Sequence, residues 1–552
     1  MITTRATASI LVTLLAINLS SLAQSPQVEV HHLDQNWNEK EIQWFYHINQ
    51  GTVLMPYDWF LALEQPETSG KLFRENDYMA GFGFLPNPNQ EGNPDGLPVG
   101  FAKATVPVKP GEPKEYDAVG FTCAACHTGQ INYKGIGIRV NGGPGMFSSE
   151  AFGTQSGRAI FETWADIRKF KRFAKKVLGQ RYPEGIIELR AQLDVFLIKV
   201  TRGAVAAALD QELSSTRGTK AGFGRVAAIG AGGNRLLSYG GVNNPRNYAA
   251  LTAPVSYPAL WDTPFFDWVQ YNAAIRQPMA RNSIEALGVG VPVTLKGPKE
   301  NLYKSSLPVE NLYLIEESLK QLKSPTWPGD ILPPIDTAKA AEGRKLYRKY
   351  CERCHALLEK RGEPRPITVT LVSLDTIGTD PNTATGFFER QVITGDLGLG
   401  TVKYFDALRI LTTEVLARRY EDLNIPPERQ EIMNGGRPND WRAPLAYRAR
   451  PHNGIWATAP FLHNGSVPNL YQMLIPAHRR DKTFYVGNLD FDPRHVGFET
   501  KEFEGGFKFD TTISGNSNAG HEFRNAPLGN GVIGPELTDT ERWNIIEFLK
   551  TL

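Results

Sequence analysis

The chain has 552 residues, 41% of them hydrophobic and 21% charged, and a formal net charge of +2. This length predicts two or three domains rather than one, and the ordinary apolar fraction excludes a chain dominated by disorder. The balanced charge provides no basic field for a nucleic acid partner. Its 52 glycines and 38 prolines predict long, loop-rich connections.

The first 23 residues have the pattern of a secretory signal peptide. Arg5 supplies the positive charge, residues 10–19 form the apolar core, and Ser21-Leu22-Ala23 is a small-x-small cleavage site. No later run reaches the roughly 18 apolar residues of a membrane span, so we expect a soluble mature chain that is periplasmic or secreted. An uncleaved anchor is the alternative.

All four cysteines belong to two copies of the pattern C-x-x-C-H. The first copy has Cys123, Cys126 and His127, and the second has Cys351, Cys354 and His355. Two disulfides, one zinc site or a thioredoxin-like pair would also explain the C-x-x-C spacing, but none of them requires the histidine. With 10 histidines in the chain, a histidine after both pairs has a chance of about 1 in 3,000.

The chemistry of c-type haem explains this spacing. Two thiols three residues apart reach the two vinyl groups on one edge of the porphyrin, and the next histidine then lies beneath the iron. The sequence therefore predicts two covalently bound haem c groups with His127 and His355 as proximal ligands. Covalent attachment also retains the cofactor outside the cell, in agreement with the signal peptide.

Between the two motifs, residues 161–213 have the apolar periodicity of two or three helices. The most aromatic stretch follows at residues 257–268. Its tryptophans, Trp261 and Trp268, are candidates for an electron relay or for the wall of a catalytic pocket. For either residue alone, a place in the core is the simpler alternative.

The second half of the chain is more regular than the first. A proline-rich stretch at residues 324–334 predicts a linker, which divides the mature chain into domains at 24–335 and 336–552. A helix at 338–350 leads into the second motif, and Thr538 with Glu541 caps a closing helix. We expect the two helices to cross at Gly343. The predicted fold is mainly α, with two cytochrome c-like domains, long irregular loops and few short strands.

The sixth iron ligand separates an electron carrier from an oxygen-activating site. No histidine lies between His127 and His355, which leaves Met146, Met279 or histidines upstream for the first haem. The second domain supplies five histidines: His452, His463, His478, His495 and His521. We favour His521, in a Gly-flanked loop, and then His463, although any single histidine is more often hydrogen-bonded or exposed than a ligand. This distribution of histidines predicts that the sixth coordination position is open at the first haem and filled at the second.

A family resemblance agrees with this asymmetry. Residues 459–470, with Arg450 and Gly454-Ile455-Trp456 ahead of them, resemble the C-terminal signature of bacterial di-haem cytochrome c peroxidases. The chain length, the Gly520-His521-Glu522-Phe523 element and the Trp-rich stretch resemble the branch that contains the haem-dependent rubber oxygenases. The resemblance covers most of the mature chain, most closely from Gly343 to the end. No displaceable histidine follows the first motif, which departs from the usual peroxidase pattern.

This resemblance implies an N-terminal haem that binds O2 or peroxide and a bis-His C-terminal haem that handles electrons. It also implies a calcium ion held between the haems by backbone carbonyls and water, although no Asp/Glu cluster identifies its ligands. The implied activity is that of a dioxygenase or peroxidase-like oxidoreductase acting on a small or apolar molecule, with an electron-donor protein as a further partner. The alternatives are a non-catalytic electron-transfer cytochrome with Met146 as ligand, and an enzyme that oxidises a partner protein at long range.

Overall fold

A computed structural model describes residues 28–213, 218–358 and 366–552. The predicted signal peptide, residues 1–23, lies outside the described residues. The architecture is mixed α/β, with 39% helix and 16% strand, so the prediction of a mainly α fold was wrong. The strands form several small sheets of two or three strands each.

The helices have the following bounds: α2 (Glu39–His47), α3 (Tyr57–Ala62), α4 (Asn76–Ala80), α5 (Cys123–Cys126), α6 (Ser149–Ala165), α7 (Ile167–Leu178), α8 (Ile186–Leu213), α9 (Ala228–Gly233), α10 (Pro278–Val289), α11 (Val309–Leu319), α12 (Thr337–Tyr350), α13 (Leu374–Ile377), α14 (Asn382–Glu389), α15 (Tyr404–Asp422), α16 (Pro427–Met433), α17 (Leu470–Met473) and α18 (Asp539–Lys550). The expected helices within 161–213 correspond to the end of α6 and to α7 and α8.

The strands have the following bounds: β1 (Glu29–His32), β2 (Met55–Pro56), β3 (Phe101–Pro107), β4 (Glu115–Phe121), β5 (Thr128–Tyr133), β6 (Ile136–Asn141), β7 (Arg225–Val226), β8 (Val255–Ser256), β9 (Thr370–Ser373), β10 (Gln391–Ile393), β11 (Thr401–Lys403), β12 (Ala446–Ala449), β13 (Thr483–Val486), β14 (Phe491–Asp492), β15 (Gly497–Phe498), β16 (Phe507–Asp510), β17 (Glu522–Phe523) and β18 (Val532–Gly534).

Two three-stranded sheets surround the first C-x-x-C-H motif. One has the order β2-β4-β3, and the other has the order β1-β6-β5, with β1 parallel to β6. The hairpin between β5 and β6 turns at Lys134 and Gly135, which both have positive φ (48° and 84°), as a tight two-residue turn requires. The motif lies between β4 and β5, so strands rather than a long helix position it. Most strands elsewhere have two to four residues, too few to leave an alternating pattern in the sequence.

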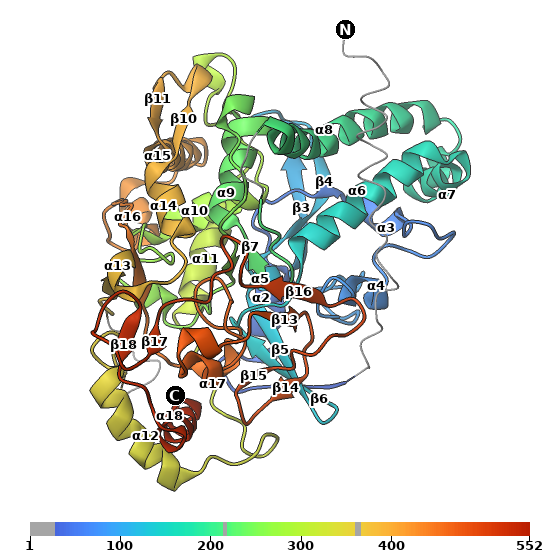
Figure 1. The fold of residues 1–552 in the computed structure, drawn as a ribbon. Coiled ribbons are helices and arrows are strands. Elements are labelled where there is room, and N and C mark those ends of the chain that lie inside the picture. Colours follow the sequence, from blue (N-terminus) through green and yellow to red (C-terminus); the bar gives the residue numbers. More distant parts are fainter. Residues whose placement is uncertain (1–27, 214–217, 359–365) are drawn as a thin grey trace.

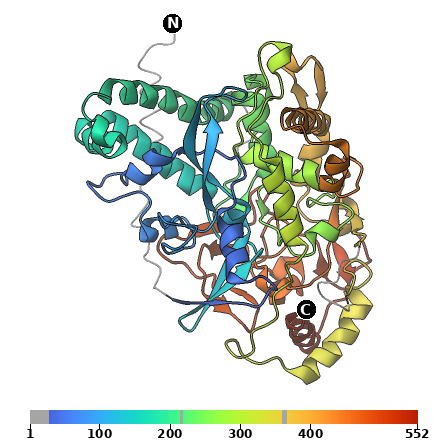
Figure 2. The same cartoon turned by 180° about the vertical axis from the view of Figure 1, so that it is seen from behind.

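The helices α12 and α18 cross as predicted, at the opposite end of the molecule from α6, α7 and α8 (Figures 1 and 2). A Cβ on Gly343 would stand 1.9 Å from the carbonyl oxygen of Asn544 in α18, so only glycine permits this approach. The predicted capping box of Thr538 and Glu541 begins α18. Both expectations about this helix pair are confirmed.

One large hydrophobic core extends from Leu33 to Leu552 and therefore includes residues on both sides of the predicted boundary at 335/336. The proline-rich stretch 324–334 packs against this core, because the indole of Trp456 donates to the carbonyl of Pro325 (3.1 Å). A second core, rich in phenylalanine, lies under α3, α6 and α7. The division into two domains stays a prediction.

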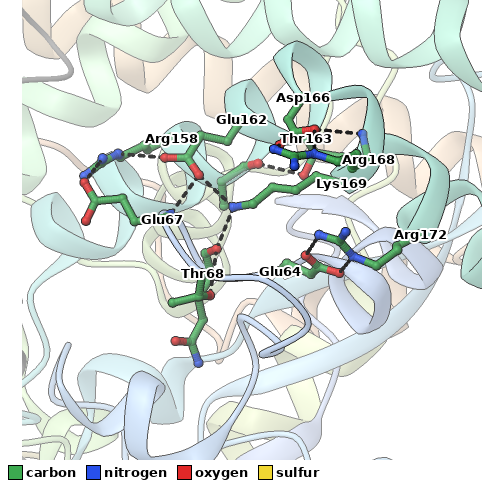
Figure 3. A network of polar contacts seen from close by, with 12 residues as sticks. Glu64, Glu67, Thr68, Arg158, Glu162, Thr163, Asp166, Arg168, Lys169 and Arg172 are labelled. Carbon is green, nitrogen blue, oxygen red and sulfur yellow. Dashed lines mark hydrogen bonds and ion pairs between the residues drawn. The ribbon is translucent and has the colours of Figure 1, made fainter.

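Ion pairs attach α6 and α7 to the segment 64–68 (Figure 3). Lys169 bridges the Glu162 carboxylate (2.7 Å) and the carbonyl of Gln65 (2.9 Å), and Arg172 makes two bonds to Glu64 (2.6 and 2.8 Å). Since each of these charges has an opposite charge beside it, the network holds the helices in place. Across the described ranges, we find no helix with both the length and the apolar character for a membrane crossing.

Candidate haem-binding sites

The first motif lies on the short helix α5, directly after β4. The Thr122 side chain caps this helix by accepting from the N–H of Ala124 (3.2 Å), while its hydroxyl donates to the carbonyl of Tyr46 (3.0 Å). Gly100 packs so closely that a Cβ there would stand 2.3 Å from the Ala125 backbone. Backbone contacts from distant segments therefore fix the turn that presents Cys123 and Cys126.

In the His127 ring, one nitrogen is hydrogen-bonded to the backbone and the other is left to bind a metal. Its Nδ1 lies 2.7 Å from the carbonyl oxygen of Pro258, and a carbonyl only accepts, so Nδ1 carries the proton and Nε2 carries the lone pair. Burial lowers the pKa of His127 to about 4, and the hydrogen bond to Pro258 partly opposes this shift. The imidazole is neutral at pH 7, as a metal ligand must be.

The cysteines do not behave as the alternatives require. All four are free thiols, which contradicts two disulfides. Within the described ranges, no group of three or more His, Cys, Asp or Glu side chains is arranged to hold a metal ion. Burial, with Glu285 next, raises the pKa of the Cys123 thiol to about 12. A reactive thioredoxin-like cysteine needs a lowered pKa instead.

Glu285, on α10, is a polar group close to the first motif that sequence reasoning missed. Its charge contributes to the raised pKa of both Cys123 and Cys126, after the effect of burial. Its side chain keeps exposed surface, although burial raises its own pKa. Gln270 donates to the Glu285 carboxyl (2.6 Å) and fixes its orientation.

The second motif repeats the histidine geometry of the first on different elements. It follows the C-terminus of α12, where the Tyr347 hydroxyl donates to the carbonyl of His355 (2.9 Å). The Nδ1 of His355 lies 2.8 Å from the carbonyl oxygen of Arg450, so its Nε2 is also the free nitrogen. Burial lowers the pKa of His355, which keeps this ring neutral as well.

Two further histidines lie against His355. The His521 ring is 6.1 Å from the His355 ring, centroid to centroid, at an angle of 65°, and the His452 ring is stacked on it at 3.9 Å. Nitrogen ligands on opposite sides of one metal stand about 4 Å apart, which places their ring centroids about 6 Å apart. His521 matches this spacing with His355, and the stacked His452 does not.

A buried arginine holds the loop that carries His521. Arg480 donates to the carbonyls of Asn518 (2.6 Å), Gly520 (2.9 Å) and His521 (2.9 Å). Burial lowers the pKa of His521 to about 3, and the charges of His355 and Arg480 add to this effect. The Nδ1 of His521 is buried without a hydrogen-bond partner. The ring is therefore neutral and not committed to another protein group through this nitrogen.

His463 lies away from this group. Its buried ring stacks on Tyr447 (4.1 Å between centroids) and stands 6.0 Å from Tyr271. Burial lowers its pKa to about 3. Among the upstream candidates, His47 has both nitrogens engaged, by the carbonyl of Phe101 (2.7 Å) and by Asn87 (2.8 Å).

The remaining candidates for the first site differ in their surroundings. His31 and His32 are exposed on β1. Met279 is fully buried in α10. Met146 is also buried, and a Cβ on Gly224 would stand 3.1 Å from its sulfur. The thioether of Met146 therefore points toward Gly224.

The two tryptophans have different settings. Trp261 is fully buried, and its indole N–H donates to the carbonyl of Asn453 (2.7 Å), just beyond the Arg450 that holds His355. Trp268 is partly buried beneath the Arg442 guanidinium, which lies 3.8 Å from the ring centroid. Trp261 is thus hydrogen-bonded to the segment that holds His355, and Trp268 forms a cation–π contact. The relay stays a prediction.

The donor set fits haem c at both motifs. Each supplies two free thiols and a neutral histidine whose Nδ1 is held by a backbone carbonyl, so that Nε2 is directed to a metal. The partners of these histidines, Pro258 and Arg450, escaped sequence reasoning because every residue has a carbonyl. Only weak features of the sequence point to His452 and Glu285. His452 is a histidine two residues after Arg450, and Glu285 is an acidic residue four residues after Arg281.

Comparison with known proteins defines the class. A family profile described as "RoxA-like, cytochrome c-like" matches residues 446–485, the stretch that contains Arg450, His452 and His463. A cytochrome c-like domain implies haem c binding, and the match supports the resemblance to the rubber oxygenase-like branch.

Two relatives come from Sinorhizobium fredii (strain NBRC 101917 / NGR234). "Uncharacterized protein y4iJ" is 42% identical over 575 residues, which cover 96% of this chain and 95% of that protein. The chain therefore belongs to the family of y4iJ. "Uncharacterized protein y4iM" is 25% identical over 309 residues, covering 53% of this chain and 63% of that protein.

Proposed function

We propose that the chain is a periplasmic or secreted di-haem c-type cytochrome oxidoreductase with different tasks at its two haems. The haem at His127 supplies a metal that activates O2 or peroxide, and the haem at His355 supplies a one-electron store. The observation that carries this proposal is the difference between the two histidines. His355 faces His521 at 6.1 Å, whereas the ring that contacts His127 among the described residues is the phenol of Tyr257 (6.4 Å).

The protein groups around the first motif favour acid–base chemistry. Burial raises the pKa of Glu285, so its carboxyl retains a proton at a higher pH than an ordinary carboxyl. A carboxylic acid of this kind can deliver or accept a proton at a bound oxygen species. The hydrogen bond from Gln270 orients the Glu285 carboxyl. The hydrogen bond from Nδ1–H of His127 to Pro258 fixes the ring, and with it the position of the Nε2 that would bind the metal.

The second motif holds two histidines, His355 and His521, that would both bind the metal of a haem placed between them. Arg480 fixes the backbone of His521 through three carbonyls, and the Tyr347 hydroxyl fixes the backbone of His355. Because hydrogen bonds hold the backbone at both histidines, the two rings would need little movement if a bound metal gained or lost an electron. This arrangement suits electron storage and delivery better than ligand exchange.

The substrate class rests on the rubber oxygenase-like resemblance alone. We propose an apolar, unsaturated small molecule that reacts with O2 or peroxide, and an electron-donor protein as a further partner. The calcium ion between the haems remains part of the proposal. No nucleic acid partner is proposed, since the net charge is only +2.

A non-catalytic electron-transfer cytochrome is the second candidate, because of one observation. Met146 directly follows Gly145, whose N–H donates to the carbonyl of Cys126 (2.8 Å). This short connection keeps Met146 close to the first motif. Coordination of the first metal by the thioether sulfur of Met146 would close the site to O2 and peroxide.

Electron paramagnetic resonance of the oxidised holoprotein distinguishes the two candidates. We expect one low-spin signal of bis-histidine type and one high-spin signal. His521→Ala converts the low-spin signal, while His463→Ala, which removes another buried histidine of the same domain, leaves it unchanged. Two low-spin signals that do not respond to cyanide would favour the electron-transfer cytochrome.

A further inference from the structure

A short chain of hydrogen bonds joins the two motif histidines. His127 donates from Nδ1 to the carbonyl of Pro258 (2.7 Å), and the next carbonyl, of Ala259, accepts from Nη1 of Arg450 (2.8 Å). The carbonyl of the same Arg450 accepts from Nδ1 of His355 (2.8 Å). The Arg450 side chain and three peptide groups, those with the carbonyls of Pro258, Ala259 and Arg450, thus separate the two rings.

Arg450 holds this connection with both arms of its guanidinium. While Nη1 donates to Ala259, Nη2 donates to the carbonyl of Trp261 (3.1 Å). A fork with fixed geometry can grip two carbonyls in this way, and a lysine ammonium cannot reproduce it. Burial lowers the pKa of Arg450, which shows that removing this cation from water has a cost that its contacts must offset.

The two backbone segments are joined at a second place. The indole of Trp261 donates to the carbonyl of Asn453 (2.7 Å), and the Asn453 amide donates to the Asp262 carboxylate (3.0 Å). Residues 258–262 and 450–453 are therefore joined by four hydrogen bonds. A shift of either segment changes the hydrogen bond that orients the histidine of the other motif.

We propose that Arg450 is a positioning residue that couples the two haem sites and completes a hydrogen-bonded electron route between them. This inference rests on the proposed function, since it requires a metal at each histidine. With a haem held at each histidine, one electron would pass from the metal at His355, which would be oxidised, to the metal at His127, which would be reduced. Both Nδ1–H groups keep their protons, so no further reactant is needed.

The test compares the wild-type holoprotein with Arg450→Lys, Arg450→Gln and a control, Arg448→Lys. Arg448, on β12 two residues before Arg450, is partly buried as Arg450 is, but its side chain reaches the carbonyl of Trp268 (3.5 Å) instead. Resonance Raman spectroscopy measures the metal–histidine vibrations, and pulse radiolysis measures the rate at which an added electron equilibrates between the haems.

Both Arg450 variants are expected to shift the vibrations of both sites and to slow the equilibration about ten-fold, with Arg450→Lys closer to wild type. Arg448→Lys should match the wild type. Unchanged vibrations and rate in the Arg450 variants, or a change at one site only, overturn the coupling. Fewer than two haems per wild-type chain, by pyridine haemochrome assay, would contradict the proposed function itself.

Discussion

Replacing Gly343 by alanine tests the helix pair that supports the second haem site. The new Cβ would stand 1.9 Å from the carbonyl oxygen of Asn544 and 2.9 Å from Cβ of Phe548. A carbon and an oxygen normally stay about 3.3 Å apart, so α12 and α18 must separate by more than about 1 Å. Overpacking of this kind costs about 3 kcal/mol, and the better helix propensity of alanine returns about 1 kcal/mol. The expected net loss in unfolding free energy is about 2 kcal/mol.

Urea denaturation of the holoprotein, followed by circular dichroism and by Soret absorbance, measures this loss. Gly386→Ala is the matched control, because Gly386 lies in helix α14 and a Cβ there meets nothing within 4 Å. The control is expected to gain up to about 1 kcal/mol from propensity alone. If Gly343→Ala proves as stable as Gly386→Ala, the close crossing of α12 and α18 is refuted.

Three further predictions concern the sites. Arg480→Lys loses carbonyl contacts to the His521 loop, so part of the low-spin optical spectrum should become high-spin; an unchanged spectrum would show that the loop holds itself. His463 has a pKa of about 3 in the folded protein and about 6.5 when unfolded. The unfolding free energy should therefore fall by about 4–5 kcal/mol between pH 6.5 and 3. In urea titrations, His463→Gln should lose this pH dependence. Glu285→Gln should lower the rate of reaction with hydrogen peroxide by about 10²-fold or more and abolish its decline as pH rises through the raised pKa; stopped-flow traces equal to wild type would exclude a proton-transfer role.

Sequence patterns predicted those parts of the fold that depend on residues close together in the chain. Helix periodicity and a capping box predicted α12 and α18, and a glycine ahead of the second motif predicted their crossing. Strands as short as β7 and β8 depend on backbone pairing between distant segments, which leaves no alternation to detect. This is why the fold was expected to be mainly α and is instead mixed.

The candidate sites, too, were predictable only where residues adjacent in the chain form them. The twin C-x-x-C-H motifs are visible in the sequence because the attachment chemistry requires adjacent residues. The choice among histidines is not, since His521 and His463 both lie in loops. Three glycines bring the His521 loop to its place: a Cβ on Gly520 would stand 2.3 Å from Gly378, and one on Gly531 would stand 2.9 Å from Gly520. Such approaches exist only in three dimensions.

The number of carbon monoxide molecules bound per reduced chain tests the central claim most directly. An open metal at His127 and a metal at His355 closed by His521 predict one carbon monoxide for every two haems, read from the Soret difference spectrum during titration. Binding of none would contradict an oxygen-activating first haem. Binding of two would contradict a second haem closed by His521.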